Sequence, residues 1–113
     1  MTNSRAKGAR GERYVANWLK ENFNLRARRG QQYCGLAGNA DVVDGFPNTH
    51  PEVKFVEKLN ITKAMEQAVR DCGNSIPYVA HKKNRGELLI TVRAKDLEMF
   101  SESVVSVANG KRK

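Results

Sequence analysis

Long apolar stretches are absent from this 113-residue sequence, and cysteine and histidine are scarce. No stretch approaches the roughly 20 consecutive apolar residues that cross a bilayer, and no apolar segment of an export signal follows Met1. The two cysteines, Cys34 and Cys72, have no paired spacing. Adding His50 and His81 gives no common zinc-binding pattern, so a zinc site is disfavoured. We therefore expect a cytoplasmic protein with reduced thiols and no contact with a membrane.

Acidic residues are in deficit, which leaves a formal net charge of +8. A domain this basic usually binds a polyanion, and without a membrane segment nucleic acid is the better candidate. The bases are concentrated in residues 1–30 and 81–95, whereas acids outnumber bases six to four between residues 31 and 80. A protein that only coats nucleic acid has little use for central carboxylates, whereas one that holds a divalent cation beside a phosphate needs them. Acids populate any protein surface, so this pattern alone does not decide.

Two helices and several short strands are predicted from the periodicity of apolar residues. Residues 5–22 and 61–72 have apolar side chains at helical spacing, and Gly73 suits the end of the second helix. Alternation and turn residues predict strands over residues 23–28, 41–43, 52–56, 78–81 and 88–92. A short helix over 95–100 and a frayed basic tail over 101–113 are expected to follow.

The fold class that these elements predict is α/β, in the order α-β-β-β-α-β-β. Residues 1–113 are expected to form a single domain with its core in about residues 5–100. The strands should form a mixed sheet with a helix against each side.

Because side chains alternate along a strand, an acid and a base two positions apart, Glu52 and Lys54, leave the same face. Val53 and Phe55 leave the other face, toward the core. Asp41 begins the preceding strand and would lie beside Glu52 if the two strands pair as a hairpin. Two carboxylates suit Mg²⁺, which completes its shell with waters and phosphate oxygens. For an E-x-K triplet taken alone, a solvated cross-strand salt bridge is the commoner interpretation.

Two further polar residues lie near the apolar faces of the predicted helices. Glu12 lies at the edge of the first apolar stripe, beside Val15 and Leu19, and a carboxylate near a core needs a partner. A metal ion is one candidate for that partner, and a neighbouring arginine is the other. Gln67 lies off the apolar face of the second helix, where it is either solvated or a support for other site residues.

The order of these residues resembles a known group of nucleases. The segment Lys7–Arg13, which opens the first helix and carries Glu12, is similar to the start of archaeal-type Holliday junction resolvases. The succession of helix glutamate, Arg-Arg-Gly loop, Asp-Val-Val strand and Glu-Val-Lys is similar to that family throughout. Small phage and prophage nucleases of the same PD-(D/E)xK superfamily look closer still, over residues 29–35, 39–43, 59–61, 65–68 and 81–85.

The resemblance implies a restriction-endonuclease-like core and an active site that binds Mg²⁺ or Mn²⁺. As metal ligands it implies three carboxylates and one peptide carbonyl, those of Glu12, Asp41, Glu52 and Val53. It further implies Lys54 as the catalytic lysine and Gln67 as a helper on the second helix. The chain departs from the pattern at Ala40, where the motif's name has proline. It also has Gln31 and Gln32 where the archaeal resolvases have a loop serine, which bears on junction specificity more than on nuclease activity.

Together the sequence predicts a Mg²⁺-dependent endonuclease that hydrolyses phosphodiester bonds in DNA, with branched DNA as its expected substrate. DNA contacts without sequence readout are expected from Arg5, Lys7, Arg10, Arg13, Arg28, Arg29, Gln31, Gln32, Lys82, Lys83 and Arg85. It would act in a bacterial or archaeal cytoplasm, including that of a phage host. Leu97, Met99 and Phe100 are candidates either for a homodimer surface or for packing of a terminal helix on its own sheet. Two alternatives stay open: a nicking or replication- and repair-linked nuclease of the same fold, and a non-catalytic basic module whose acids are structural.

Overall fold

Helices and strands alternate along the chain in the computed structural model, which describes residues 4–30 and 41–111, with side chains over 8–30 and 41–108. The elements are α1 (Ser4–Asn22), β1 (Arg28–Arg29), β2 (Val42–Val43), β3 (Thr49–Phe55), α2 (Ile61–Asp71), β4 (Ile76–Lys82), β5 (Leu89–Val92), the short 3₁₀ helix η1 (Ala94–Asp96) and α3 (Leu97–Lys111). β3 is parallel to β4, and β4 is antiparallel to β5, so the three strands form a mixed sheet in the order β3-β4-β5. β1 and β2 form a separate antiparallel pair.

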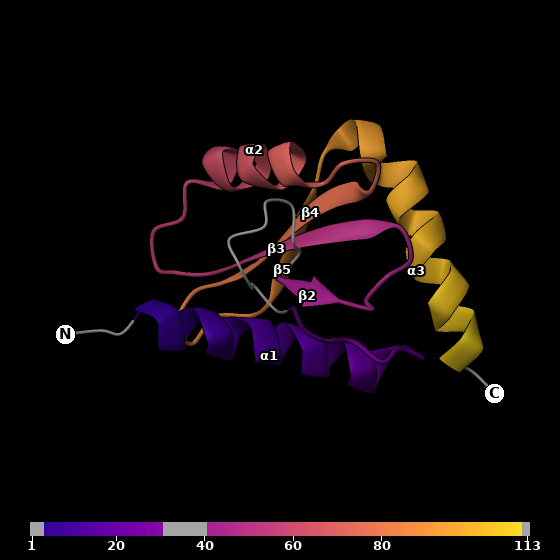
Figure 1. Cartoon of the computed structure of the whole chain (residues 1–113), viewed down its shortest axis with the longest axis horizontal. Coiled ribbons are helices and arrows are strands. Elements are labelled where there is room, and N and C mark those ends of the chain that lie inside the picture. Colours follow the sequence, from indigo (N-terminus) through magenta and orange to yellow (C-terminus); the bar gives the residue numbers. More distant parts are fainter. Residues whose placement is uncertain (1–3, 31–40, 112–113) are drawn as a thin grey trace.

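Helices α1 and α2 cover opposite sides of the strands, as Figure 1 shows. α1 packs against β1, β2 and β3, whereas α2 packs against β3 and β4. The connection from β3 through α2 to the parallel strand β4 is the crossover that places a helix over one face of a sheet. The predicted α/β class, with a mixed sheet and a helix against each side, is confirmed.

α1 is held in place by an apolar stripe and by a close approach of its backbone to β3. Val15 and Leu19, one turn apart, are both fully buried. At Gly11 an added Cβ would lie only 3.0 Å from Cγ of the Phe55 ring, so the missing side chain lets the helix contact the strand. This contact brings the next residue, Glu12, against the strands.

The ends of α2 follow from local chemistry. The side chain of Asn60 accepts a 3.0 Å hydrogen bond from the Lys63 N–H and caps the first turn. Gly73 has a φ of +58°, the left-handed conformation that ends helices, as its position in the sequence predicts. The helix therefore ends at Asp71. Because α2 packs on β3 and β4, this acidic residue lies beside the strands.

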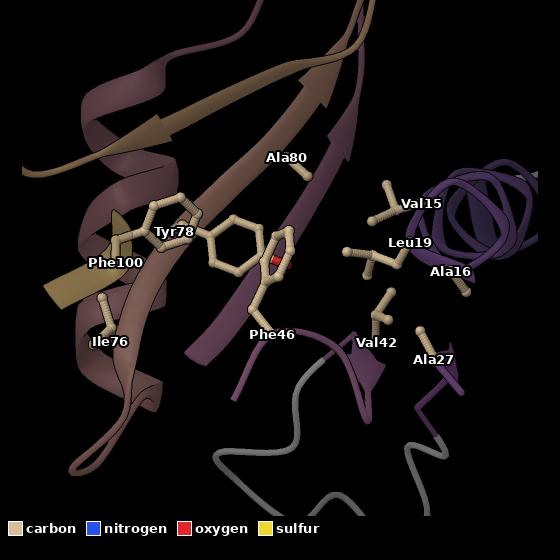
Figure 2. Close-up of a cluster of buried hydrophobic side chains, with 10 residues drawn as sticks. All are labelled: Val15, Ala16, Leu19, Ala27, Val42, Phe46, Ile76, Tyr78, Ala80 and Phe100. Carbon is tan, nitrogen blue, oxygen red and sulfur yellow. The ribbon is translucent and has the colours of Figure 1, made fainter. Parts of the chain in front are cut away.

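The core is an aromatic cluster that joins the two sides of the domain. The ring centroids of Phe46 and Tyr78 are 6.1 Å apart, and those of Tyr78 and Phe100 are 5.1 Å apart. Figure 2 shows Val15 and Leu19 pointing from α1 toward the Phe46 ring. The core therefore runs from α1, through the loop after β2, to β4 and α3.

The C-terminal region differs from the prediction. A frayed tail from residue 101 was expected after a short helix, but α3 continues from Leu97 to Lys111. Phe100 is buried, and Val104 and Val107 pack against the same core cluster. Their spacing places the three residues on one face of the helix, so tertiary packing orders a segment that local composition favours poorly.

The segment before β1 and the partner of β2 also differ from the prediction. The strand expected over residues 23–28 is reduced to Arg28–Arg29, because Phe23 and Leu25 belong to a turn and pack against the core cluster instead. The hairpin considered between the strands that carry Asp41 and Glu52 is not found among the described residues, because β2 pairs with β1. The remaining predicted elements are found within a few residues of their expected bounds.

Candidate functional site

The free edge of β3 carries the first part of the candidate site. In the described sheet β3 has β4 on one side only. On the other side the peptide N–H of Val53 donates a 2.8 Å hydrogen bond to Oδ2 of Asp41. The N–H and C=O of a residue in a parallel strand leave on the same side, so the Val53 carbonyl also faces this edge. Asp41 is thus placed beside β3 as expected, although a hydrogen bond to the backbone holds it there rather than a hairpin.

Glu52 precedes Val53 and is almost fully buried, with 5% of its surface exposed. The amino group of Lys54 lies 3.4 Å from Oε2 of Glu52, so both side chains leave the same face, as their spacing predicts. Burial, and next the nearby charge of Asp41, raise the pKa of Glu52 to about 7 against the opposing effect of Lys54. The protein's own groups therefore offset little of the cost of holding a negative charge on Glu52.

Glu12 reaches the same region from α1 and is also buried, with 8% exposed. Its Oε1 accepts a 2.6 Å hydrogen bond from Nε of Arg29. Burial raises the pKa of Glu12; the hydrogen bond with Arg29 opposes that shift, and the charge of Asp41 adds to it. Of the two partners proposed from the sequence, the arginine is present, and the carboxylate still lies close enough to Asp41 to feel its charge.

The charge of Asp41 raises the pKa of both other acids of the site, Glu12 and Glu52. Burial raises the pKa of Asp41, while the Val53 N–H and the charge of Lys54 lower it. Three carboxylates from separate segments thus have raised pKa values, and each pKa is raised mainly by burial. Like charges so placed favour protonation or the binding of a cation.

Two residues that the sequence did not single out together, His50 and Asp71, also lie beside Glu52. One potential ligand atom from each of these three residues lies within 4.8 Å of the other two. Burial lowers the pKa of His50. Since His50 is two positions before Glu52, strand alternation could have placed it on the Glu52 face. Asp71 comes from α2, and its position depends on the crossover.

Gln67 lies half-buried on α2, four residues before Asp71. Within the described residues it makes no hydrogen bond to the acidic side chains. Its proposed helper role therefore remains a prediction.

Several basic residues expected to bind DNA have partners within the protein. Arg28 contacts Asp44 at 3.3 Å, and Arg29 is bound to Glu12. The amino group of Lys82 lies over the rings of Tyr14 and Phe55, at 5.6 and 5.8 Å from their centroids. The remaining described candidates, Arg10, Arg13, Lys83 and Arg85, have exposed side chains. Arg5 and Lys7 belong to α1 before its described side chains begin, and Gln31 and Gln32 lie outside the described residues.

Comparison of the chain with protein-family models, curated proteins and solved structures found no match in any of the three. Among the described residues, no helix is long and apolar enough to cross a membrane.

Proposed function

We propose that this protein is a metal-dependent endonuclease of the PD-(D/E)xK class that hydrolyses phosphodiester bonds in DNA. The observation that carries the proposal is the convergence of Glu12, Asp41 and Glu52 near the edge of β3, with Lys54 beside Glu52. Gathering buried carboxylates is unfavourable without a cation, and it is unexpected in a chain with a net charge of +8 unless the acids have a function.

The donor atoms fit a hard divalent cation. The carboxylates of Asp41 and Glu52 and the carbonyl of Val53 are oxygen donors, the kind that Mg²⁺ and Mn²⁺ prefer. A cation bound by these groups supplies an activated water and stabilises charge that develops on the phosphate. The raised pKa of Glu52, about 7, supports this assignment because a bound cation would stabilise its ionised form.

Lys54 and Arg29 complete the chemistry that the protein itself provides. Lys54 is positioned by its 3.4 Å contact with Glu52, so its ammonium group can neutralise charge on a phosphate bound beside the acids. Arg29 orients the carboxylate of Glu12 through their hydrogen bond. Glu12 therefore acts in this proposal at the rim of the metal site, as a ligand or as the partner that fixes Arg29 toward the DNA.

Exposed basic residues would bind the phosphates of the DNA backbone. The contact of Lys82 with the ring of Tyr14 places the end of β4 against the middle of α1. Arg10 and Arg13 on α1 and Lys83 and Arg85 in the turn are thus brought toward one end of the domain. Contacts of this kind bind phosphates without reading sequence, which suits an enzyme that recognises the shape of branched DNA. We propose branched DNA as the substrate, a homodimer as the active form and the cytoplasm as its location.

Incubation with end-labelled DNA tests the proposal directly. A four-way junction and a linear duplex of matched sequence are each incubated with the protein, with Mg²⁺ and separately with EDTA. We expect Mg²⁺-dependent internal cuts that EDTA abolishes and that Glu52→Gln removes. Glu66→Gln, which changes an exposed acid on α2, should cut at the wild-type rate. Binding without any cutting, in Mg²⁺ or Mn²⁺, would favour the non-catalytic alternative.

A further inference from the structure

A second group of potential metal ligands lies on the face of β3 that is covered by α2. His50 and Glu52 are two positions apart on β3, and both are 5% exposed. Asp71 reaches them from the last position of α2, which packs on β3 and β4. One ligand atom from each residue lies within 4.8 Å of the others. The three side chains therefore surround one small volume between the helix and the strand.

One nitrogen of the buried His50 imidazole lacks a partner in the described part of the chain. Its Nε2 is buried and makes no hydrogen bond to any described residue. A buried polar nitrogen without a partner costs roughly 1–3 kcal/mol, so native proteins rarely leave one. A cation held between His50 and the two neighbouring carboxylates would give this nitrogen the electron-pair acceptor that the protein does not offer.

The end of α2 adds a second reason to expect a positive charge there. The carbonyl groups at the C-terminus of a helix carry about half an elementary negative charge, so an acidic residue at that position is unfavourable. Asp71 is the last residue of α2, and it lies beside Glu52, another acid. Two carboxylates and a helix C-terminus thus meet with one ammonium group, that of Lys54, beside Glu52, and a divalent cation would offset the remaining negative charge.

From this arrangement we infer that His50, Glu52 and Asp71 form a second metal site, selective for a divalent transition ion such as Mn²⁺. One imidazole nitrogen with two carboxylate oxygens suits Mn²⁺, Fe²⁺ or Zn²⁺ better than Mg²⁺, which prefers oxygen donors alone. The ligand set differs from the one at the β3 edge, because Asp41 is bonded to the Val53 peptide whereas His50 and Asp71 meet Glu52 where α2 packs on β3. Glu52 belongs to both sites, so its carboxylate would join the two cations.

Binding at this site does not depend on the proposed nuclease activity, so it can be tested without DNA. The full-length protein is freed of metal with EDTA and dialysed, and then titrated with Mn²⁺. Electron paramagnetic resonance counts the bound ions, and electron spin echo modulation detects nitrogen bonded to Mn²⁺. We expect a nitrogen signal from the wild type.

Variants assign that signal to residues. His50→Gln should remove the nitrogen signal and one bound Mn²⁺. Asp71→Asn should lower the affinity for that Mn²⁺ by at least about tenfold. Asp41→Asn should keep the nitrogen signal, because Asp41, although its charge acts on His50, is not one of the three proposed ligands. His81→Gln is the matched control: His81 bonds to Thr91 at 2.8 Å and is not one of the three grouped ligands, so its replacement should change neither measurement.

Folding of each variant is checked by thermal unfolding in EDTA. If His50→Gln does not fold, Asp71→Asn decides, because it keeps the size of the side chain and lies at a helix end. The inference is wrong if the wild type gives no nitrogen signal, or if that signal survives in a folded His50→Gln. A nitrogen signal in a protein that cuts no DNA would support this metal site and reject the nuclease proposal. Cutting without a nitrogen signal would support the nuclease proposal and reject this metal site.

Discussion

The peptide N–H of Val53 and Oδ2 of Asp41 are joined by a 2.8 Å hydrogen bond that links the segment before β2 to the open edge of β3. The position of Asp41 is therefore fixed by the backbone of the strand that carries Glu52 and Lys54. An asparagine at position 41 could accept the same hydrogen bond through its amide oxygen, while its negative charge would be gone. Charge and position can thus be separated at this residue.

Asp41→Asn is expected to reduce DNA cleavage by at least about 100-fold, because the metal loses a charged ligand. DNA affinity should be unchanged or tighter, since a negative charge near the phosphate is removed. Initial cleavage rates and competition binding on the same labelled DNA measure the two effects. The matched control is Asp44→Asn, which changes an exposed acid whose positive φ of 60° asparagine also tolerates. Near wild-type cleavage by Asp41→Asn would end the metal-site assignment.

Lys54→Ala is expected to lower the cleavage rate by orders of magnitude and to leave the dissociation constant nearly unchanged, because Lys54 acts on the transition state. Lys83→Ala should do the opposite, weakening binding and reducing the salt dependence by about one unit of slope for a lost phosphate contact. Lys83 is a cleaner probe than Lys82, which lies over the Tyr14 and Phe55 rings. Salt titrations of DNA binding measure the effect on affinity, and single-turnover rates measure the effect on the chemical step. Parallel losses of rate and affinity in both variants would make Lys54 another phosphate contact.

Much of the fold, and within the site the pair Glu52 and Lys54, could be predicted from local patterns in the sequence. Helical spacing located α1 and α2, because each buries one apolar face. Strand alternation placed Glu52 and Lys54 on the same face, and the 3.4 Å contact between them confirms it. These features depend on residues near one another in the chain, which a single sequence records.

What the sequence could not supply depends on contacts between distant segments. Asp71 joins His50 and Glu52 only because the crossover brings the end of α2 over β3. Likewise, residues 101–107 are mostly serine and valine, which favour a helix weakly, so a frayed tail was the reasonable prediction. Packing of Val104 and Val107 against the core outweighs that weak preference.

In EDTA the protein should become less stable between about pH 4.5 and pH 7. The pKa of Glu52 is raised from 4.5 to about 7 in the fold, so the folded state holds this proton more tightly than the unfolded chain does. The stabilisation is complete below pH 4.5 and is lost as the pH rises through about 7, by about 3 kcal/mol. Urea unfolding across this range measures it, and Glu52→Gln should reduce the dependence, while the raised pKa values of Glu12 and Asp41 and the lowered pKa of His50 shape what is left. An unchanged profile in Glu52→Gln would show that Glu52 ionises as it does in water.

Two glycines in α1 should respond oppositely to substitution. Gly8→Ala is expected to raise the free energy of unfolding by about 0.5–1 kcal/mol, because nothing lies within 4 Å of the new methyl group and alanine favours helix. At Gly11 the Cβ would lie 3.0 Å from Cγ of the Phe55 ring. Gly11→Val should therefore lower the free energy of unfolding by about 1–3 kcal/mol. Urea denaturation of both variants provides the comparison, and equal effects would mean that α1 does not press on β3.

Resolution of a four-way junction requires symmetric cuts on two strands, and each chain is proposed to carry one cutting centre at the edge of β3. A dimer with twofold symmetry matches the symmetry of such a junction and supplies both centres. We therefore expect a homodimer that binds four-way junctions at least about 10-fold more tightly than linear duplex at equal salt, a difference of about 1.4 kcal/mol.

Of the three residues proposed for the dimer surface, Phe100 is in the core, whereas Leu97 and Met99 are 54% and 55% exposed. Replacing both exposed residues with glutamate should dissociate a dimer that uses them while leaving the fold intact, because neither side chain is buried. Glu98→Gln, on the same turn, is the control that should remain dimeric. Sedimentation velocity reports the assembly, and competition binding reports the junction preference. A wild-type monomer that cuts linear duplex as well as junctions would reject branched DNA as the substrate, but the proposal of metal-dependent cleavage would stand.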